Sequence, residues 1–218
     1  MLAGEGVIAI WNGITPEGRV EFYAWHLHEH MPERVGVPGF RRGRRYIATG
    51  PGTSPEFFTL YETDTLQVTQ GQDYANRLNA PTSWTRTATA HFRDTFRSLA
   101  AVTQSEGPGM GAALLTLRFD CVDPAEIAAL LREVSRAPRV CGAHLCEADR
   151  AASDVRTAET RGRTDIQAPP ARFLLVEATD VAALSGLLPE AALSAVGLER
   201  MIRGVYVLEY SRGKTAWT

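Results

Sequence analysis

The feature that most constrains this fold is an order of strands and helices that the sequence predicts twice in succession: strand, helix, strand, strand, helix, strand. In the first half, short runs rich in β-branched and aromatic residues predict the strands. Longer stretches with helical periodicity predict the helices between them, with breaks at Pro38-Gly39 and at Asn79-Ala80-Pro81. This is the order of a split βαβ unit. The predicted strands are residues 7–11, 40–48, 57–62 and 93–102, and the predicted helices are residues 19–35, 65–79 and 84–91.

The same order returns after the Ser-Glu-Gly-Pro-Gly sequence at residues 105–109. Asp123 and Pro124 are typical of an N-cap and a first helical turn, and they predict where the first helix of this half begins. We therefore predict two units, residues 1–104 and residues 110–218. The predicted strands of the second unit are residues 112–119, 140–146, 173–177 and 204–210, and its predicted helices are residues 125–136 and 181–188.

Apolar residues occupy both faces of the predicted strands, so both faces of each sheet must be covered. Helices can cover one face of each sheet. Packing the two sheets against each other inside the chain covers the other face. The sequence therefore predicts an α+β fold class, with two tandem ferredoxin-like βαββαβ units that pack sheet against sheet.

The bulk composition argues against several classes of protein. The formal net charge of −2 is unlike the strong basic excess of a general nucleic-acid binder. No stretch reaches the roughly 18 apolar residues that a membrane helix needs. Residues 1–11 lack the basic n-region and the length of a signal peptide. We expect a soluble, cytoplasmic protein with no nucleic-acid or membrane partner.

All three cysteines, Cys121, Cys141 and Cys146, lie in the second half. An odd number without a spaced framework indicates reduced thiols in a reducing compartment. Cys141 and Cys146 do not form a CxxC pair, and only His144 lies near them in sequence. We therefore expect buried strand cysteines and no metal site.

The long segment of residues 151–171 interrupts the second half, because it is polar and charged and ends with Pro169-Pro170. Loops longer than about 12–15 residues are usually functional or disordered. A lid and an arm onto a neighbouring subunit are two interpretations. We favour the third, a loosely packed excursion on the surface.

The densest group of reactive side chains lies on the first predicted helix, where His26, His28 and His30 fall within five residues. At about 100° per residue, His26 points away from the apolar stripe of this helix, and we expect it in solvent. His28 and His30 lie at the two margins of the stripe. The residues of the stripe, which should face the sheet, are Val20, Ala24, Leu27, Met31 and Val35.

These histidines have several interpretations. His26 and His30 have the i, i+4 spacing of helical metal ligands, but no third ligand is evident. Because the side chains diverge around the helix, we predict that no metal is bound. For His26 the alternative is a surface residue without a role. For His30, a hydrogen-bonded and partly buried histidine competes with a neutral imidazole that acts as general acid or base near pH 7.

Arginines are concentrated on the strand of residues 40–48, where a period of two puts Arg42, Arg44 and Tyr46 on one face. Buried arginines need carboxylate or phosphate partners. A substrate carboxylate is the functional interpretation. RNA binding on the sheet is a third, but no RNP-like motif is present and the net charge is acidic. The carboxylates of the chain that could serve instead are Glu29, Glu33 and Glu62.

Two linked motifs carry a family resemblance. The pattern Phe22-x-x-Trp25-x-x-x-x-His30-x-Pro32, followed by Val37-Pro38-Gly39-Phe40-x-x-x-Arg44-Arg45-Tyr46, resembles the EthD-like members of the dimeric α+β-barrel superfamily. The resemblance covers the first half of the chain. The second half agrees only in element order, since its first helix has no histidine. Further similar positions are Leu60-Tyr61-Glu62, Tyr74, Asn79-Ala80-Pro81-Thr82 and Trp84.

The resemblance implies a barrel of strands with helices outside and a pocket between the first helix and its own sheet. Relatives include cofactor-free monooxygenases, cyclases, muconolactone isomerases and decarboxylase-like lyases. Carried onto this chain, His30 becomes the catalytic candidate. The substrate-binding candidates are Trp25, Tyr46 and Tyr61, with Arg44 or Arg42 as an anion anchor.

We therefore expect a cofactor-independent enzyme that acts on a small aromatic or unsaturated acidic metabolite. His30 would move a proton in a pocket bounded by Tyr46 or Tyr61. A homodimer is left open. The alternative is a non-catalytic small-ligand binder or an assembly protein on the same scaffold, because a fold alone does not decide between chemistry and binding.

Overall fold

The structure, a computed structural model, describes residues 1–121, 124–168 and 170–215, without the side chains of residues 121, 124 and 125. Its strands form one sheet in the order β1-β3-β2-β9-β5-β8-β6-β4-β7, and β1 also pairs with β4. That last pairing closes eight strands into an antiparallel barrel. The strands are β1 (Gly6–Ile14), β2 (Phe40–Ala48), β3 (Phe57–Thr63), β4 (Phe92–Glu106), β5 (Ala113–Cys121), β6 (Val140–Ala148), β7 (Ile166–Gln167), β8 (Arg172–Ala178) and β9 (Leu198–Gly213).

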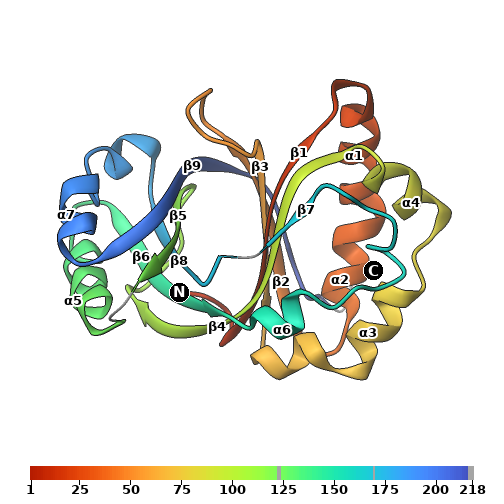
Figure 1. The fold of residues 1–218 in the computed structure, drawn as a ribbon, viewed down its shortest axis with the longest axis horizontal. Helices are drawn as coiled ribbons and strands as arrows, with labels where there is room; N and C mark the ends of the chain where they lie inside the picture. The colour runs from red at the N-terminus through yellow and green to blue at the C-terminus, as the bar shows by residue number, and fades with distance from the viewer. Residues whose placement is uncertain (122–123, 169, 216–218) are drawn as a thin grey trace.

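Helices cover the barrel on two opposite sides (Figure 1). Those of the first half pack beside β1, β2 and β3, and those of the second half beside β5, β6 and β8. The predicted α+β class and the barrel implied by the resemblance are confirmed. The helices are α1 (Arg19–Trp25), α2 (Met31–Gly36), α3 (Gln72–Asn79), α4 (Ser83–Thr89), α5 (Pro124–Val134), α6 (Arg150–Ser153) and α7 (Glu190–Ala195), and shorter turns are η1 (Pro16–Gly18), η2 (His26–His30), η3 (Leu66–Gln70) and η4 (Val181–Leu184).

The two predicted sheets pack around one barrel interior, and they are also joined at their edges, which the sequence did not predict. The edges join through β2 with β9 and β4 with β6. Both joining strands are long: β4 has 15 residues and β9 has 16. β4 pairs with β1 over Phe92–Ala101 and with β6 over Ala100–Glu106. Closure leaves none of the barrel strands with an unpaired edge along its whole length, and it gives both halves one shared interior.

Strand alternation sorts side chains between the barrel interior and the helix-covered faces. On β1, Trp11 points inward and packs against Phe58 and Phe173 from both halves, with ring centroids 4.9 Å and 5.3 Å away. Ile8 points outward to the core beneath α2 and α3. Apolar residues on both strand faces therefore serve two different cores, one inside the barrel and one under the helices.

The segment between β6 and β8 packs against the first half, so the expected loose excursion was wrong. We call residues 154–168 the strap; Figure 1 shows it leaving α6, passing beside α3 and returning through β7. The Glu159 amide donates to the Leu78 carbonyl at 3.1 Å, and β7 pairs in parallel with Thr95 and Phe96 of β4. The polar sequence of this segment is used in hydrogen bonds across the chain, which composition alone did not reveal.

Three smaller predictions have definite outcomes or lie outside the described part. Cys141 and Cys146 are free thiols; Cys146 is buried as expected, but Cys141 is only half-buried, and the Cys121 side chain is not described. The expected N-cap Asp123 also lies outside the described residues. In the described part of the chain, no helix is long and apolar enough to cross a membrane.

Candidate functional site

The first helix runs from Arg19 to Gly36 through one π turn, η2, and this turn changes which side chains face the sheet. A π turn inserts an extra residue and shifts the helical phase. Val20 is 82% exposed and Leu27 is 38% exposed, so the predicted apolar stripe was wrong at both positions. The buried side chains are Phe22, Trp25, His26, His30, Met31, Arg34 and Val35.

His26 was expected in solvent, but it is 3% exposed. Its ring lies against Phe22, with centroids 5.3 Å apart, and its Nδ1 is 3.4 Å from Nη1 of Arg45. Burial, followed by the positive charge of Arg45, holds the pKa of His26 well below its ordinary value. His28, in the same turn, is exposed. The π turn therefore buries His26 and His30 and leaves His28 outside.

His30 is 6% exposed and lies against aromatic rings. Its ring centroid is 4.1 Å from that of Trp25 and 6.2 Å from that of Tyr61. The Nδ1 atom is buried without a hydrogen-bond partner among the described residues. Burial, followed by the charge of Arg34, holds the pKa of His30 well below its ordinary value. His30 is therefore a neutral imidazole with one free ring nitrogen.

Three more polar atoms near His30 are buried without a partner in the described part of the chain: Nη1 of Arg34, Nε of Arg77 and Oη of Tyr61. Both arginine charges act on His30, and Arg34 also acts on Tyr61. Burial dominates at Tyr61 and raises the pKa of its hydroxyl, which stays protonated. Unpaired buried polar groups cost free energy, so several in one place call for an explanation.

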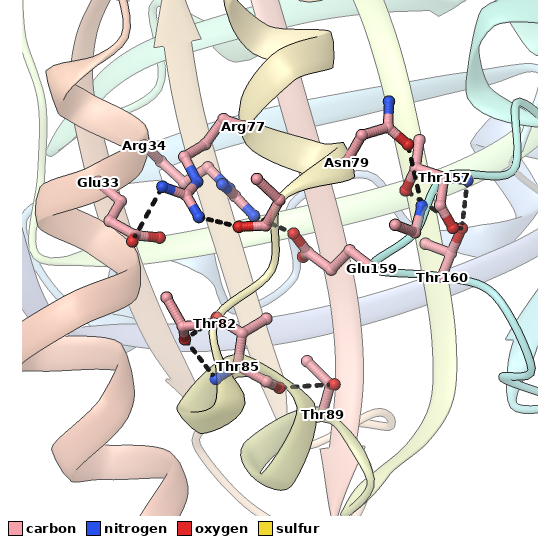
Figure 2. A network of polar contacts seen from close by, with 12 residues as sticks. Glu33, Arg34, Arg77, Asn79, Thr82, Thr85, Thr89, Thr157, Glu159 and Thr160 are labelled. Carbon is pink, nitrogen blue, oxygen red and sulfur yellow. Dashed lines mark hydrogen bonds and ion pairs between the residues drawn. The ribbon is translucent and has the colours of Figure 1, made fainter.

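Carboxylates hold the other ends of the two arginines, as Figure 2 shows. Arg34 pairs with Glu159 of the strap, and Arg77 pairs with Glu33 at 3.4 Å. The side chains of Arg77 and Glu33 are 28% and 21% exposed, so this pair reaches solvent. We call His30, Arg34, Tyr61 and Arg77 the His30 cluster. Each arginine of the cluster pairs with a carboxylate through one nitrogen and has another nitrogen that is buried without a partner among the described residues.

Trp25 is held in place from the opposite direction. Its Nε1 donates to Oγ1 of Thr85 at 3.2 Å, and Oγ1 of Thr85 donates to Glu29 at 3.1 Å. Thr82 is the N-cap of α4 and donates to the same Glu29 oxygen at 2.6 Å. Glu29 was a candidate partner for the strand arginines, but these hydroxyls occupy it. The ring of Trp25 is thereby fixed against His30.

Tyr46 and Arg44 lie on the opposite face of the sheet from His30, inside the barrel. A pocket bounded by both His30 and Tyr46 is therefore ruled out by the strand alternation. Nη1, Nη2 and Nε of Arg44 lie 2.8, 3.0 and 2.8 Å from carboxylate oxygens of Glu177 and Glu62. Arg42 also pairs with Glu62, at 2.6 Å. Arg44 is therefore paired with carboxylates of the chain itself, and this explains its burial better than a substrate anion does.

This interior network joins the two halves of the chain. Glu177 also lies 3.6 Å from Nε2 of His144, whose Nδ1 is 2.8 Å from Oγ of Ser105. Burial raises the pKa of Glu177, but the hydrogen bond from His144 and the charge of Arg44 outweigh it and lower this pKa to about 2. Glu177 is 133 residues away from Arg44, which explains why the sequence did not predict this pair.

Arg118 is another interior arginine that the sequence prediction did not include. Its guanidinium carbon lies 4.4 Å from the Phe96 centroid and 5.0 Å from the Trp11 centroid. Burial lowers the pKa of Arg118 to about 10. Cation–π contacts with two rings stabilise this charge.

The sequence also did not single out Arg34, Arg77 and Glu159 as site residues. Arg34 follows the His-x-Pro motif by two positions, and this proximity was the available signal. Glu159 lies in the long polar segment, whose path could not be predicted. Among the described residues, no group of three or more His, Cys, Asp or Glu side chains is placed to hold a metal ion.

No family model matches this chain, and no curated protein matches its sequence. Solved structures do match over nearly the whole chain. An anthrone oxidase-like protein has a TM-score of 0.60 at 11% identity, covering 95% of this chain and 92% of that one. A putative monooxygenase from Lactobacillus acidophilus has a TM-score of 0.56 at 7% identity, covering 96% of each chain.

A putative monooxygenase from Fusobacterium nucleatum has a TM-score of 0.54 at 8% identity, covering 98% of this chain and 96% of that one. At such low identities the similarity shows a shared fold and does not show a shared activity. The chain therefore has the α+β fold of these monooxygenase-like proteins.

Proposed function

We propose that this protein is a cofactor-independent enzyme that acts on a small aromatic or unsaturated acidic metabolite, with His30 as general acid and base. One observation carries the proposal: a buried, neutral imidazole has a free nitrogen beside two arginines that also have free N–H groups. A structural histidine in such a position would ordinarily be hydrogen-bonded.

The chemistry follows from the charges in the His30 cluster. A neutral imidazole can accept a proton from an acidic C–H or O–H group of a substrate. The substrate anion that forms would be stabilised by the free N–H groups of Arg34 and Arg77 and by the hydroxyl of Tyr61. His30, now protonated, can return the proton to another atom, which completes an isomerisation or assists a leaving group.

The aromatic rings around His30 favour a flat or unsaturated substrate. The rings of Trp25 and Tyr61 contact His30, and the Tyr74 ring centroid lies 5.9 Å from the guanidinium carbon of Arg34. The names of the fold neighbours, monooxygenase and anthrone oxidase-like, support an oxygenase variant. In that variant the carbanion reduces O2 to a hydroperoxide bound to the same carbon, and loss of water leaves a carbonyl group. Entry of a substrate requires the partly exposed Glu33–Arg77 pair to open.

Proton abstraction can be tested before the complete reaction is known. Exchange of the acidic C–H for deuterium would be followed by NMR in D2O under argon. Three carbon acids serve as probes: 1,8-dihydroxyanthrone, muconolactone and 4-hydroxyphenylpyruvate. We expect the protein to accelerate exchange of at least one probe, and His30→Gln to reduce that acceleration about 10²–10⁴-fold.

His28→Gln is the matched control, because His28 lies in the same turn and is exposed. It should exchange the probe at the wild-type rate. Equal acceleration by His30→Gln and wild type, or no acceleration with any probe, contradicts the proposal and favours a non-catalytic binding role.

We also propose that the first half belongs to the EthD-like branch and that residues 1–104 and 110–218 are tandem βαββαβ units. The His-x-Pro motif of the first unit and the observed element order of both halves support this. The second unit has α5 in place of the His-bearing helix. Light scattering during size-exclusion chromatography decides whether two such chains form a homodimer.

A further inference from the structure

Two adjoining cavities lie between the strap and β4, and neither is lined by a residue of the His30 cluster. The larger, of about 490 Å³, is bounded by α3, β4, α6 and the strap. The smaller, of about 340 Å³, lies between β4 and the strap on the β7 side. Arg97, Val155 and Arg156 line both. The larger volume lies within the usual range of small-molecule sites, about 300–1,000 Å³.

The strap is anchored at both ends around these cavities. Near α3, the Ala158 amide donates to Oδ1 of Asn79 at 3.1 Å, and Glu159 pairs with Arg34. Near β7, Arg163 donates to Asp165 at 2.6 Å, and Thr95 of β4 donates to the same carboxylate oxygen at 2.6 Å. Figure 2 shows Thr157 and Thr160 of the strap facing Asn79. The strap therefore shapes a preformed cavity, which is typical of a ligand site.

Apolar side chains make up much of the larger cavity. Leu78 comes from α3 and Leu99 from β4, and both belong to the buried core beneath the helices. Ala152 of α6 and Val155 of the strap face them across the cavity. Val155 is 59% exposed, so much of its side chain is accessible. This surface suits the apolar body of a ligand.

Two arginines that line both cavities have no carboxylate partner among the described residues. Arg97 donates to Oη of Tyr74 at 3.3 Å, and Arg156 has no hydrogen-bond or ion-pair partner in the described part of the chain. The carboxylate of Asp149 is occupied, because it caps α6 through Ala152 N and accepts from Gln70. Asp154 lines only the smaller cavity. Each cavity therefore keeps a net positive charge.

We propose that the strap-covered cavity is a binding site for an organic acid that has an apolar body and one carboxylate group. Arg97 and Arg156 would bind the carboxylate, and Leu78, Leu99 and Val155 would contact the apolar part. A purely inorganic anion would leave the apolar surface uncovered, and a neutral hydrocarbon would leave two cations unpaired. The site does not include His30, so it does not depend on the proposed catalytic function.

The probe for this site is 2-naphthoate, with neutral 2-naphthamide as its isosteric control, both measured by isothermal titration calorimetry. We expect saturable binding of 2-naphthoate and much weaker binding of 2-naphthamide. Arg97→Met and Arg156→Met should each weaken 2-naphthoate about tenfold or more, the usual effect of losing a charge-assisted hydrogen bond. Circular dichroism would check that both variants are folded.

Arg161→Met is the matched control, because Arg161 is an exposed arginine of the same strap that lines neither cavity. It should bind 2-naphthoate like wild type. The proposal is overturned if 2-naphthoate shows no saturable binding, if Arg161→Met weakens it as much as Arg156→Met, or if only His30→Gln abolishes it. The last result would place the ligand at the His30 cluster instead.

Discussion

Arg44 in the barrel interior differs from Arg34 and Arg77 on the outer face of the first half in how its guanidinium group is paired. Inside the barrel, all three guanidinium nitrogens of Arg44 lie within 3.0 Å of carboxylate oxygens from two different strands. Under the first helix, Arg34 and Arg77 each keep a buried nitrogen without a partner among the described residues. Paired charges join the halves of the fold, whereas half-paired charges beside a neutral histidine are suited to a ligand.

The interior ion pair is expected to contribute much more to stability than an exposed ion pair. Glu177→Gln removes one of the two carboxylates of Arg44 and should lower the free energy of unfolding by about 3 kcal/mol, as for other broken buried ion pairs. Urea denaturation at neutral pH measures the loss. Glu56→Gln is the control, since the Arg19–Glu56 pair is 39% and 35% exposed and should contribute at most about 1 kcal/mol. Equal losses in the two variants would remove the distinction between the regions.

The same carboxylate predicts an acid-dependent loss of stability. The pKa of Glu177 is about 2 in the folded chain and 4.5 ordinarily, so its contribution is present above pH 4.5 and is lost as the pH falls toward 2. Such a shift corresponds to about 3 kcal/mol. The free energy of unfolding, measured from pH 7 to pH 3, should therefore fall more steeply in wild type than in Glu177→Gln. Parallel curves would be inconsistent with a strongly lowered pKa.

Replacing His144 in the barrel and His30 on the outer face should have smaller effects on the free energy of unfolding. His144 in the barrel contacts Ser105 and Glu177, so His144→Leu should cost about 1–3 kcal/mol, because the Ser105 hydroxyl loses its partner and Glu177 loses one of its partners. His30→Leu removes a buried nitrogen without a partner and should change stability by less than about 1 kcal/mol. Thermal and urea unfolding of both variants provide the test. A large loss in His30→Leu would make His30 a structural residue.

The smallest expected change in the free energy of unfolding tests which side chains of the first helix face the sheet. Val20 is 82% exposed, so Val20→Lys should change the free energy of unfolding by no more than about 0.5 kcal/mol. Phe22→Ala, two residues on, should cost about 3–5 kcal/mol, since Phe22 is 1% exposed. If instead Val20→Lys were the costly change, the π turn would be misplaced and the stripe predicted from the sequence would be right.

Local patterns predicted most elements of this fold, but the helix predicted over residues 181–188 is only the short turn η4, and α7 was not predicted. The strand of residues 40–48 was predicted with the bounds that β2 has, and the helix-ending Pro38-Gly39 was also found. The helix phase could not be predicted, because a π turn leaves no period in the sequence. How the two sheets join could not be predicted either. Edge pairing of β2 with β9 depends on strands far apart in the chain.

The candidate site was predicted in part. The sequence singled out His30, Trp25 and Tyr61, and the structure brings their rings together. Tyr46 and Arg44 were included because alternation along β2 does not tell which face meets the helix. Arg77 and Glu159 required the paths of α3 and the strap, and these follow from long-range contacts alone.

The most direct test of the central claim is the protonation state of His30 at pH 6. A ¹⁵N spectrum of protein labelled at histidine, assigned by difference with His30→Gln, reports whether each ring nitrogen carries a proton. Because burial and Arg34 hold its pKa well below the ordinary value, His30 should be neutral at pH 6, with one nitrogen free to accept a proton. A ring protonated on both nitrogens at pH 6 would contradict its role as the base.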